Sequence, residues 1–477
     1  RCQIDCKDNK NNLNIQQNNF NIMKKKFLLF LLAIVAGMGT IFAESGKCGE
    51  NLTWNLTNGV LTISGTGEMY DYGALSVPWY SQRESITSLI IGNSVTRIGK
   101  EAFSGCSSLT SINIPNSVTE IGAWAFFECS SLASVTIGNN VSTIEDAAFN
   151  WCESIIKVTL NSDAIVSKDY HGLGYCLIDI FGYQVEEYII GDNVTRIGDN
   201  AFGYYAIDEH NLTSVTIGNG VTSIGSEAFY GCSNLVSVSL PEGVTSIGDE
   251  AFEGCSSLSS INIPESVTSI EQMAFFACTS LTSINIPEGI TIIETAVFSG
   301  CSFASINIPQ SVTIIAPQAF WGCSSLTSIN IPNSVTYIGS EAFSECSSLT
   351  SITIPEGITR IETQTFFNCS SLTSISIPEG VTSIEPVAFS RCSSLTAINI
   401  PNSVTTIGTE AFSECESLTS VVLGSGITNL GSADSREGVF AYSDNLTSVT
   451  CYAINPPTIH EWFGDNTIIY VPAESVS

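Results

Sequence analysis

Cysteine is the residue type with the greatest chemical capacity in this chain, and 17 cysteines occur among its 477 residues. Zinc sites need closely paired ligands such as CxxC, and the sequence contains no CxxC pair. A Cys–His nucleophile would need histidines that recur beside the cysteines, but the three histidines are His171, His210 and His460. We therefore expect small buried side chains that fill a corner of the fold without an evident hydrogen-bond partner. Disulfides between neighbouring cysteines are the alternative in an oxidising compartment.

Acidic residues also recur, which raises the question of calcium binding. They fall in two regions of the repeated pattern, in the turn at Glu242, Glu288, Glu356 and Glu379, and near the repeated cysteine at Glu128, Glu253, Glu345 and Glu414. A calcium loop needs a dense DxDxD-type cluster, which this spacing lacks, so we interpret these residues as a solvated acidic face. The formal net charge of -30 disfavours nucleic acid and anionic membrane surfaces as partners. We expect no metal, no cofactor and no enzymatic activity.

The cysteines mark a repeat. Twelve of them stand 23 residues apart within runs, with one step of 22 and one wide gap, at Cys106, Cys129, Cys152, Cys232, Cys255, Cys278, Cys301, Cys323, Cys346, Cys369, Cys392 and Cys415. Apolar residues keep fixed columns around them, as in LTSINIPNSVTEIGAWAFFECSS at residues 109–131. A constant period with constant apolar columns predicts a solenoid of stacked coils. About fifteen coils between Ile86 and Asn445 would form a rod roughly 70 Å long.

Each coil has the same expected parts. Residues 109–114 alternate and are β-branched, which predicts a short strand that ends at Pro115. Residues 118–122 predict a second short extended segment. Residues 124–131 are too few for a stable free helix, so we expect a 3₁₀ or short helical turn that depends on packing. Parallel stacking of these parts would bury the apolar columns between neighbouring coils.

One column beside the core alternates between aromatic and mostly small residues. It follows the repeated phenylalanine by one position, and its aromatic members are Tyr230, Phe276, Trp321 and Phe367. Coils about 4.8 Å apart leave little room for unstacked rings side by side, and a ring folded over a small neighbour relieves this crowding. Two interpretations remain open, a packing ridge at the edge of the core or an exposed stripe that binds protein or carbohydrate.

The pattern stretches between residues 155 and 211, where two coils are longer than the rest. This stretch contains the tyrosines Tyr170, Tyr175, Tyr204 and Tyr205. Loops that bulge from a repeat array often carry binding, and tyrosine suits interfaces. These tyrosines are therefore candidate binding residues. The alternative is a structural role in which the rings fill a wider turn.

The N-terminal segments have separate expected roles. Residues 1–22 precede Met23 and are interpreted as translated upstream sequence, with a genuine extension as the alternative. Residues 23–43 have a lysine-rich start, an apolar run and Ala43 before Glu44, which predicts a cleaved signal peptide rather than a membrane anchor. Residues 44–85 carry alternating apolar residues around Asn58-Gly59, which predicts a β-hairpin cap over the first coil.

The pattern LxxIxIPxxVxxIGxxAFxxCxS, repeated over most of the chain, resembles the BspA-like leucine-rich repeats of bacterial surface proteins. This resemblance implies a right-handed solenoid with a parallel sheet on one face. Residues 44–85 resemble the N-terminal cap of that family, and residues 446–477 resemble part of its C-terminal cap. The implied function is binding by a secreted or cell-surface monomer, often in adhesion. The implied partner is a host matrix or cell-surface protein or glycan, without membrane insertion after signal cleavage. A structural spacer is the alternative.

Overall fold

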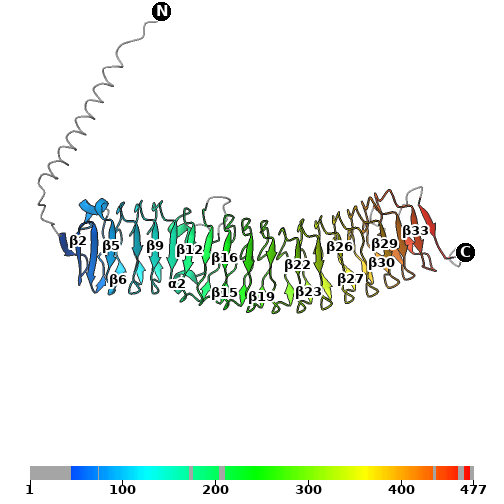
Figure 1. The fold of residues 1–477 in the computed structure, drawn as a ribbon, viewed down its shortest axis with the longest axis horizontal. Coiled ribbons are helices and arrows are strands. Elements are labelled where there is room, and N and C mark those ends of the chain that lie inside the picture. The colour runs from blue at the N-terminus through cyan, green and yellow to red at the C-terminus, as the bar shows by residue number, and fades with distance from the viewer. Residues whose placement is uncertain are drawn as a thin grey trace, which may run out of the picture.

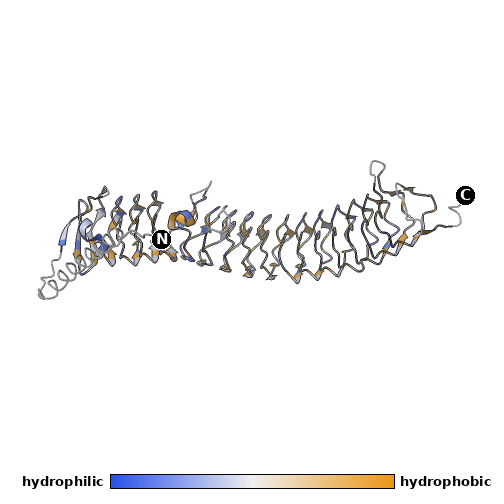
Figure 2. Ribbon diagram, turned by 90° about the horizontal axis from the view of Figure 1, so that it is seen from above, coloured by the Kyte–Doolittle hydropathy of each residue, from blue (hydrophilic) through white to orange (hydrophobic). Residues whose placement is uncertain are grey.

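The chain forms a long, gently curved rod of stacked coils (Figure 1). The structure, a computed structural model, describes residues 44–73, 75–170, 176–203, 210–432, 437–459 and 467–472. Its parallel strands make a solenoid of about 15 turns, which confirms the predicted leucine-rich-repeat architecture. Figure 2 shows that apolar residues recur in every coil along the rod.

Each regular coil contributes one strand to each of two parallel ladders. The first ladder contains β5 (Ser88–Ile91), β7 (Ser111–Asn113), β9 (Ser134–Ile137), β11 (Lys157–Leu160), β12 (Glu187–Ile190), β14 (Ser214–Thr216), β16 (Ser237–Ser239), β18 (Ser260–Asn262), β20 (Ser283–Ile284), β22 (Ser305–Asn307), β24 (Ser328–Asn330), β26 (Ser351–Ile352), β29 (Ala397–Ile400), β31 (Ser420–Leu423), β33 (Ser448–Cys451) and β35 (Ile468–Tyr470). Between β26 and β29 one coil pairs through the isolated bridge of Thr353 with Ser376.

The second ladder runs along another edge of the rod. It contains β4 (Gly67–Glu68), β6 (Val95–Ile98), β8 (Glu120–Ile121), β10 (Thr143–Ile144), β13 (Arg196–Ile197), β15 (Ser223–Ile224), β17 (Ser246–Ile247), β19 (Ser269–Ile270), β21 (Ile292–Ile293), β23 (Ile314–Ile315), β25 (Tyr337–Ile338), β27 (Arg360–Ile361), β28 (Ser383–Ile384), β30 (Thr406–Ile407), β32 (Asn429–Leu430) and β34 (Thr458–Ile459). Pairing joins like positions, so that Ile224 of β15 lies opposite Ile247 of β17. The register of the solenoid therefore follows the repeat.

The segment expected to be a 3₁₀ or helical turn is a series of single tight turns. The amides of Ala125 and Cys129 donate to the carbonyls of Gly122 and Phe126, three residues earlier. Other amides in the segment bond to the next coil, as Phe126 N does to Ala148 O at 2.8 Å. Backbone groups that a longer helix would satisfy internally are here satisfied by the neighbouring coil. This explains why so short a segment is ordered only within the stack.

The predicted hairpin cap is present at the N-terminal end. β1 (Glu44–Lys47), β2 (Leu52–Thr57) and β3 (Val60–Gly65) form a sheet with β5 in the order β1-β2-β3-β5. The turn between β2 and β3 has positive φ at both Asn58 and Gly59, 52° and 78°, which fits a two-residue hairpin turn. β3 pairs in parallel with β5 and thereby joins the cap to the first coil. A 3₁₀ helix, η1 (Tyr80–Ser85), follows the cap sheet.

The additional residues of the stretched coils form two short helices, α2 (Asp163–Val166) and α3 (Leu177–Phe181). The N-cap residue of α2 is Ser162, whose side chain accepts a hydrogen bond from Ile165 N. The second ladder has no strand from the coil between β10 and β13, where α2 lies beside β13. Beyond Asn445, β33 and β35 continue the first ladder and β34 continues the second.

The core contains one column of aromatic rings along the array. It begins at Trp79 in the cap, whose ring stacks on Phe103 with centroids 5.7 Å apart, and its last described member is Phe440. In the stretched coils Phe181 and the fully buried Tyr188 continue the column to Phe202. Offset contacts at these separations are favourable for aromatic pairs. The ring column links the cap to the array through a continuous packed core.

Candidate binding surfaces

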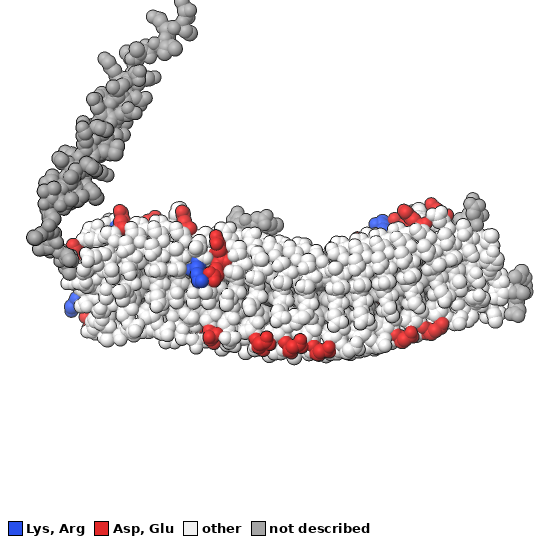
Figure 3. Space-filling view, viewed as in Figure 1, with Lys and Arg blue, Asp and Glu red and all other residues white. Residues whose placement is uncertain are grey.

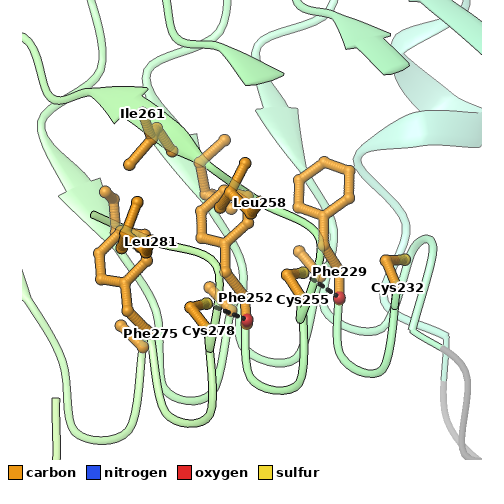
Figure 4. Close-up of a cluster of buried hydrophobic side chains, with 14 of the residues drawn as sticks. Phe229, Cys232, Phe252, Cys255, Leu258, Ile261, Phe275, Cys278 and Leu281 are labelled. Atoms are coloured by element: carbon orange, nitrogen blue, oxygen red, sulfur yellow. Dashed lines mark hydrogen bonds between the residues drawn. The ribbon is translucent and has the colours of Figure 1, made fainter. Parts of the chain in front are cut away.

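The cysteine ladder lies beside the ring column, and its thiols are buried donors. The thiol of Cys255 donates to the carbonyl of Phe229 at 3.2 Å, and that of Cys278 donates to Phe252 at 3.2 Å (Figure 4). The same bond to the preceding coil recurs through the ladder, including Cys346 to Phe320. The expectation that these cysteines lack a hydrogen-bond partner was therefore wrong from Cys129 onward, because the stacking brings a phenylalanine carbonyl within reach of those thiols.

These thiols have no reactive character. All cysteines within the described ranges are free thiols in buried positions. Burial raises the pKa of Cys106, Cys323 and Cys415 to about 12. A thiol that stays protonated at neutral pH is a poor nucleophile and a poor metal ligand. Within the same ranges, no group of three or more His, Cys, Asp or Glu is arranged to hold a metal ion.

The aromatic stripe, defined as Tyr230, Phe276, Trp321 and Phe367, lies at the surface of the turn segments. Trp321 is 40% exposed, and the other three are half-buried. The serines that occupy the same column in the intervening coils are buried, with Ser299 only 1% and Ser344 only 2% exposed. Adjacent core rings in this region are 5.1 to 6.0 Å apart. Rings that alternate with small buried serines, with Glu253 as the exception, fit the expected relief of crowding, and part of each ring is exposed to solvent.

The two ends of the stripe differ in charge. At Tyr230 the carboxylates Glu253, Glu250 and Glu227 follow burial as causes that raise the pKa of the phenol. Burial, then Glu250 and Glu227, raises the pKa of Glu253 to about 7. At the other end the guanidinium of Arg391 lies 5.3 Å from the ring centroid of Phe367. A partner along the stripe would meet an acidic end and a cationic end.

The stretched coils do not present the expected tyrosine surface within the described residues. Tyr170 is 4% exposed, and its hydroxyl donates to Ile165 O at 2.8 Å, so this ring is part of the core. Tyr175, Tyr204 and Tyr205 lie outside the described residues. His210 is buried, with Nε2 at 3.2 Å from Gly231 O. Tyr170 is therefore left out of the binding surface considered below.

A second aromatic group, absent from the expected sites, lies near the cap. Trp124 and Trp151 are 40% and 65% exposed, and Phe127 is half-buried in the column of the stripe. Trp124, Phe127 and Tyr80 line a cavity of about 420 Å³ between η1 and the first two coils. The position of Phe127, one residue after the core ring of Phe126, was a usable signal in the sequence. No signal in the sequence indicated that Phe127 lies close to η1.

Two other surface hollows are less suited to binding, because one has no aromatic side chain in its wall and the other is lined by carboxylates without a basic residue. Serine and asparagine side chains of β16, β18 and β20 line a shallow neutral groove of about 460 Å³. Glu414, Glu416, Tyr442 and Asp444 line an acidic hollow of about 580 Å³ near the C-terminal end. Figure 3 shows acidic side chains along both visible edges of the rod and few basic ones. The distribution of charge thus agrees with a mainly solvated acidic surface.

None of the described helices is both long and apolar enough to span a lipid bilayer. A family model described as the BspA type leucine rich repeat region matches residues 78–207, 195–327 and 313–447. No curated protein matches the chain.

Solved structures also resemble the chain. A leucine-rich repeat protein from Bacteroides ovatus is 26% identical over 89% of this chain and 99% of that one, with a TM-score of 0.57. A leucine rich cell surface protein from Faecalibacterium prausnitzii is 29% identical over 79% of this chain and 94% of that one, with a TM-score of 0.38.

Proposed function

The chain belongs to the BspA-type leucine-rich-repeat family, and we propose that it is an exported surface protein that adheres to a macromolecular partner. The repeat solenoid supports a protein-binding role. The partner class is a host matrix or cell-surface protein, and the proposed contact surface is the aromatic stripe. The observation that carries this proposal is the exposure of Trp321 at 40% above serines that are nearly fully buried. Aromatic anchors of this kind contribute disproportionately when a partner desolvates them.

Export is the part of the proposal that concerns residues 23–43, which lie outside the described residues. It is supported by the lysine-rich start, the apolar run and Ala43 before Glu44. We expect mass spectrometry of the secreted protein to find Glu44 at the mature N-terminus. A mature chain that begins before Met23 would contradict both the signal-peptide and the upstream-translation interpretations, and one that begins at Met23 would contradict the cleaved signal peptide alone.

The stripe is tested by replacing Phe276 and Trp321 with serine, which is the residue that the intervening coils already have. A pull-down with the full chain against host matrix proteins and glycans first identifies a partner. We expect the double variant to bind that partner at least about tenfold more weakly, because two partly exposed anchors are lost. Thermal melting should change little.

The matched control replaces two exposed apolar residues outside the stripe, Val236 and Tyr337, with serine. These residues are 48% and 40% exposed, so a similar amount of apolar surface is removed. Binding by the control should stay within about twofold of the original chain, since its anchors are intact. Equal binding by both double variants would refute the stripe. A collapsed melt of the stripe variant would show that the rings serve packing.

A structural spacer is the second candidate function, favoured by the elongated shape of the rod (Figure 1). A spacer holds another component at a distance and needs no exposed anchors. It therefore predicts that neither double variant alters any association of the purified chain. The stripe experiment thus separates the two functions.

A further inference from the structure

We propose that the cavity between η1 and the first two coils binds a sugar residue of a glycan. This cavity, called the cap pocket below, has a volume of about 420 Å³, within the range of small-ligand sites. It lies near the N-terminal cap, whereas the aromatic stripe begins at Tyr230. The assignment is independent of the partner proposed for the stripe.

The first support is a set of aromatic platforms. Tyr80 comes from η1, and Trp124 and Phe127 come from the turn of the second coil. Trp124 has φ of 55°, a left-handed conformation in which a bulky residue is unfavourable, and its ring is 40% exposed. The same positive φ occurs at Glu101 and Ala147 in the neighbouring coils, and Lys100 Nζ lies 4.7 Å from the Trp124 ring centroid. A pyranose presents an apolar C–H face that such a ring can cover.

The second support is a balanced set of polar groups around those rings. The Glu101 side chain is only 13% exposed, and Lys100 Nζ is 3.8 Å from its Oε1, too far for a strong hydrogen bond. Its carboxylate therefore keeps acceptor capacity on the cavity side. Ser104 and Glu128 also line the wall. Sugar hydroxyls need donors and acceptors together beside an apolar face, and the cap pocket supplies both.

Arg83 supplies the donors. Its guanidinium carbon lies 3.8 Å from the ring centroid of Tyr80, and within the described residues it takes part in no ion pair. Gly105, with φ of 73°, leaves space for the Arg83 side chain, because a Cβ at Gly105 would come within 2.6 Å of Arg83 Nε. An arginine held flat on a ring keeps several N–H donors for a neutral polar ligand.

An exposed tryptophan, Trp151, lies one coil further along the rod from the pocket. Glu128 on the pocket wall and Trp151 occupy the same position of neighbouring coils, and Trp151 is 65% exposed. Neighbouring coils are separated by about 5 Å, which is the length of one sugar residue. A second sugar unit would therefore reach the Trp151 ring, so we infer a short oligosaccharide rather than a free monosaccharide as the ligand.

The test uses the full chain and a printed panel of neutral hexose, N-acetylhexosamine and uronic-acid oligosaccharides. We expect binding to at least one neutral oligosaccharide, with a dissociation constant confirmed by titration calorimetry. Trp124→Asn, which retains a residue tolerant of positive φ, should weaken that binding at least about tenfold because a stacking platform is lost. Glu101→Gln should weaken it less, since one acceptor oxygen remains.

The matched control is Trp321→Ser, which removes a tryptophan that is also 40% exposed but lies in the stripe. It should leave oligosaccharide binding unchanged, whereas Trp124→Asn should leave binding of the stripe partner unchanged. The proposal is overturned if no panel member binds at millimolar concentration, if Trp124→Asn binds as well as the original chain, or if the pocket binds a peptide instead. Matching thermal melts establish that each variant is folded.

Discussion

Raising the pH above about 9 is expected to unfold the solenoid steeply, because its buried thiols resist ionisation. Free thiols of an unfolded chain ionise near pH 8.5, whereas burial raises the pKa of Cys106, Cys323 and Cys415 to about 12. Between these values the native state holds more protons than the unfolded state. The free energy of unfolding therefore falls as the pH rises, by about 1.4 kcal/mol per pH unit for each such thiol.

The effect grows with the number of coils that unfold together. A cooperative unit of three coils would lose about 4 kcal/mol per pH unit, and a longer unit would lose more. Urea denaturation followed by circular dichroism at several pH values from 8 to 10.5 measures this slope. We expect a midpoint that is nearly constant up to pH 8.5 and that decreases sharply above it.

The control replaces Cys323 and Cys346 with serine, whose hydroxyl does not ionise in this range but can still donate to the preceding phenylalanine carbonyl. The decrease of the free energy of unfolding with pH should become shallower by about 2.8 kcal/mol per pH unit. This change is expected even if the substitutions shift the urea midpoint at neutral pH. Thiol titration in denaturant without reductant should count the cysteines as free. Thiols that react only after reduction would indicate disulfides, and an unchanged midpoint from pH 8 to 10.5 would contradict the linkage.

Replacing Phe320 with alanine is expected to destabilise the chain by about 3–5 kcal/mol, the usual cost of removing a buried aromatic side chain. The ring is fully buried and lies between Phe298 and Phe343, with centroids 5.7 and 5.5 Å away. The resulting cavity would interrupt the ring column. Because coils contact mainly their neighbours, the two halves of the array should then unfold in separate transitions.

Trp321→Ser is the matched control for this prediction, since Trp321 is the next residue and its ring is at the surface. It should cost clearly less than Phe320→Ala, because 40% of Trp321 is already exposed to solvent whereas Phe320 is fully buried. Denaturation monitored by circular dichroism compares the two variants. Equal losses of stability would contradict the inward and outward assignment of these two positions.

The repeat permitted a detailed prediction of the fold. The alternation of Ile112 and Ile114 with polar residues, and the proline after them, predicted the short strand that is observed as β7. The Asn58-Gly59 dipeptide predicted the hairpin between β2 and β3. These signals are local, and stacking then repeats them, so a single coil specifies most of the rod. The alternation of aromatic and small residues in the stripe column was visible in the sequence, but it left a packing ridge and an exposed stripe both open.

Other features depend on contacts between segments that differ in sequence. The sequence left Tyr170 open between a binding residue and a ring that fills a wider turn; in the structure its hydroxyl donates to Ile165 O and its ring is buried. The partner of the ladder thiols from Cys129 to Cys415 is a carbonyl of the preceding coil, and side-chain identities alone do not show which backbone oxygen the stacking brings within reach. In both cases the turn conformation, rather than the residue type, determined the outcome.

The sequence by itself determined the period, the inward columns and the parallel register, because a repeated pattern buries its apolar residues only when like positions stack. Only the tertiary structure decided which side chains come together at the boundary between the repeat array and the non-repeated cap. Arg83 and Tyr80 of η1 meet Trp124 and Phe127 around the cap pocket. No periodicity relates the cap to the array. The contact between these four residues therefore depends on how η1 packs against the first coils, and the sequence pattern does not predict that packing.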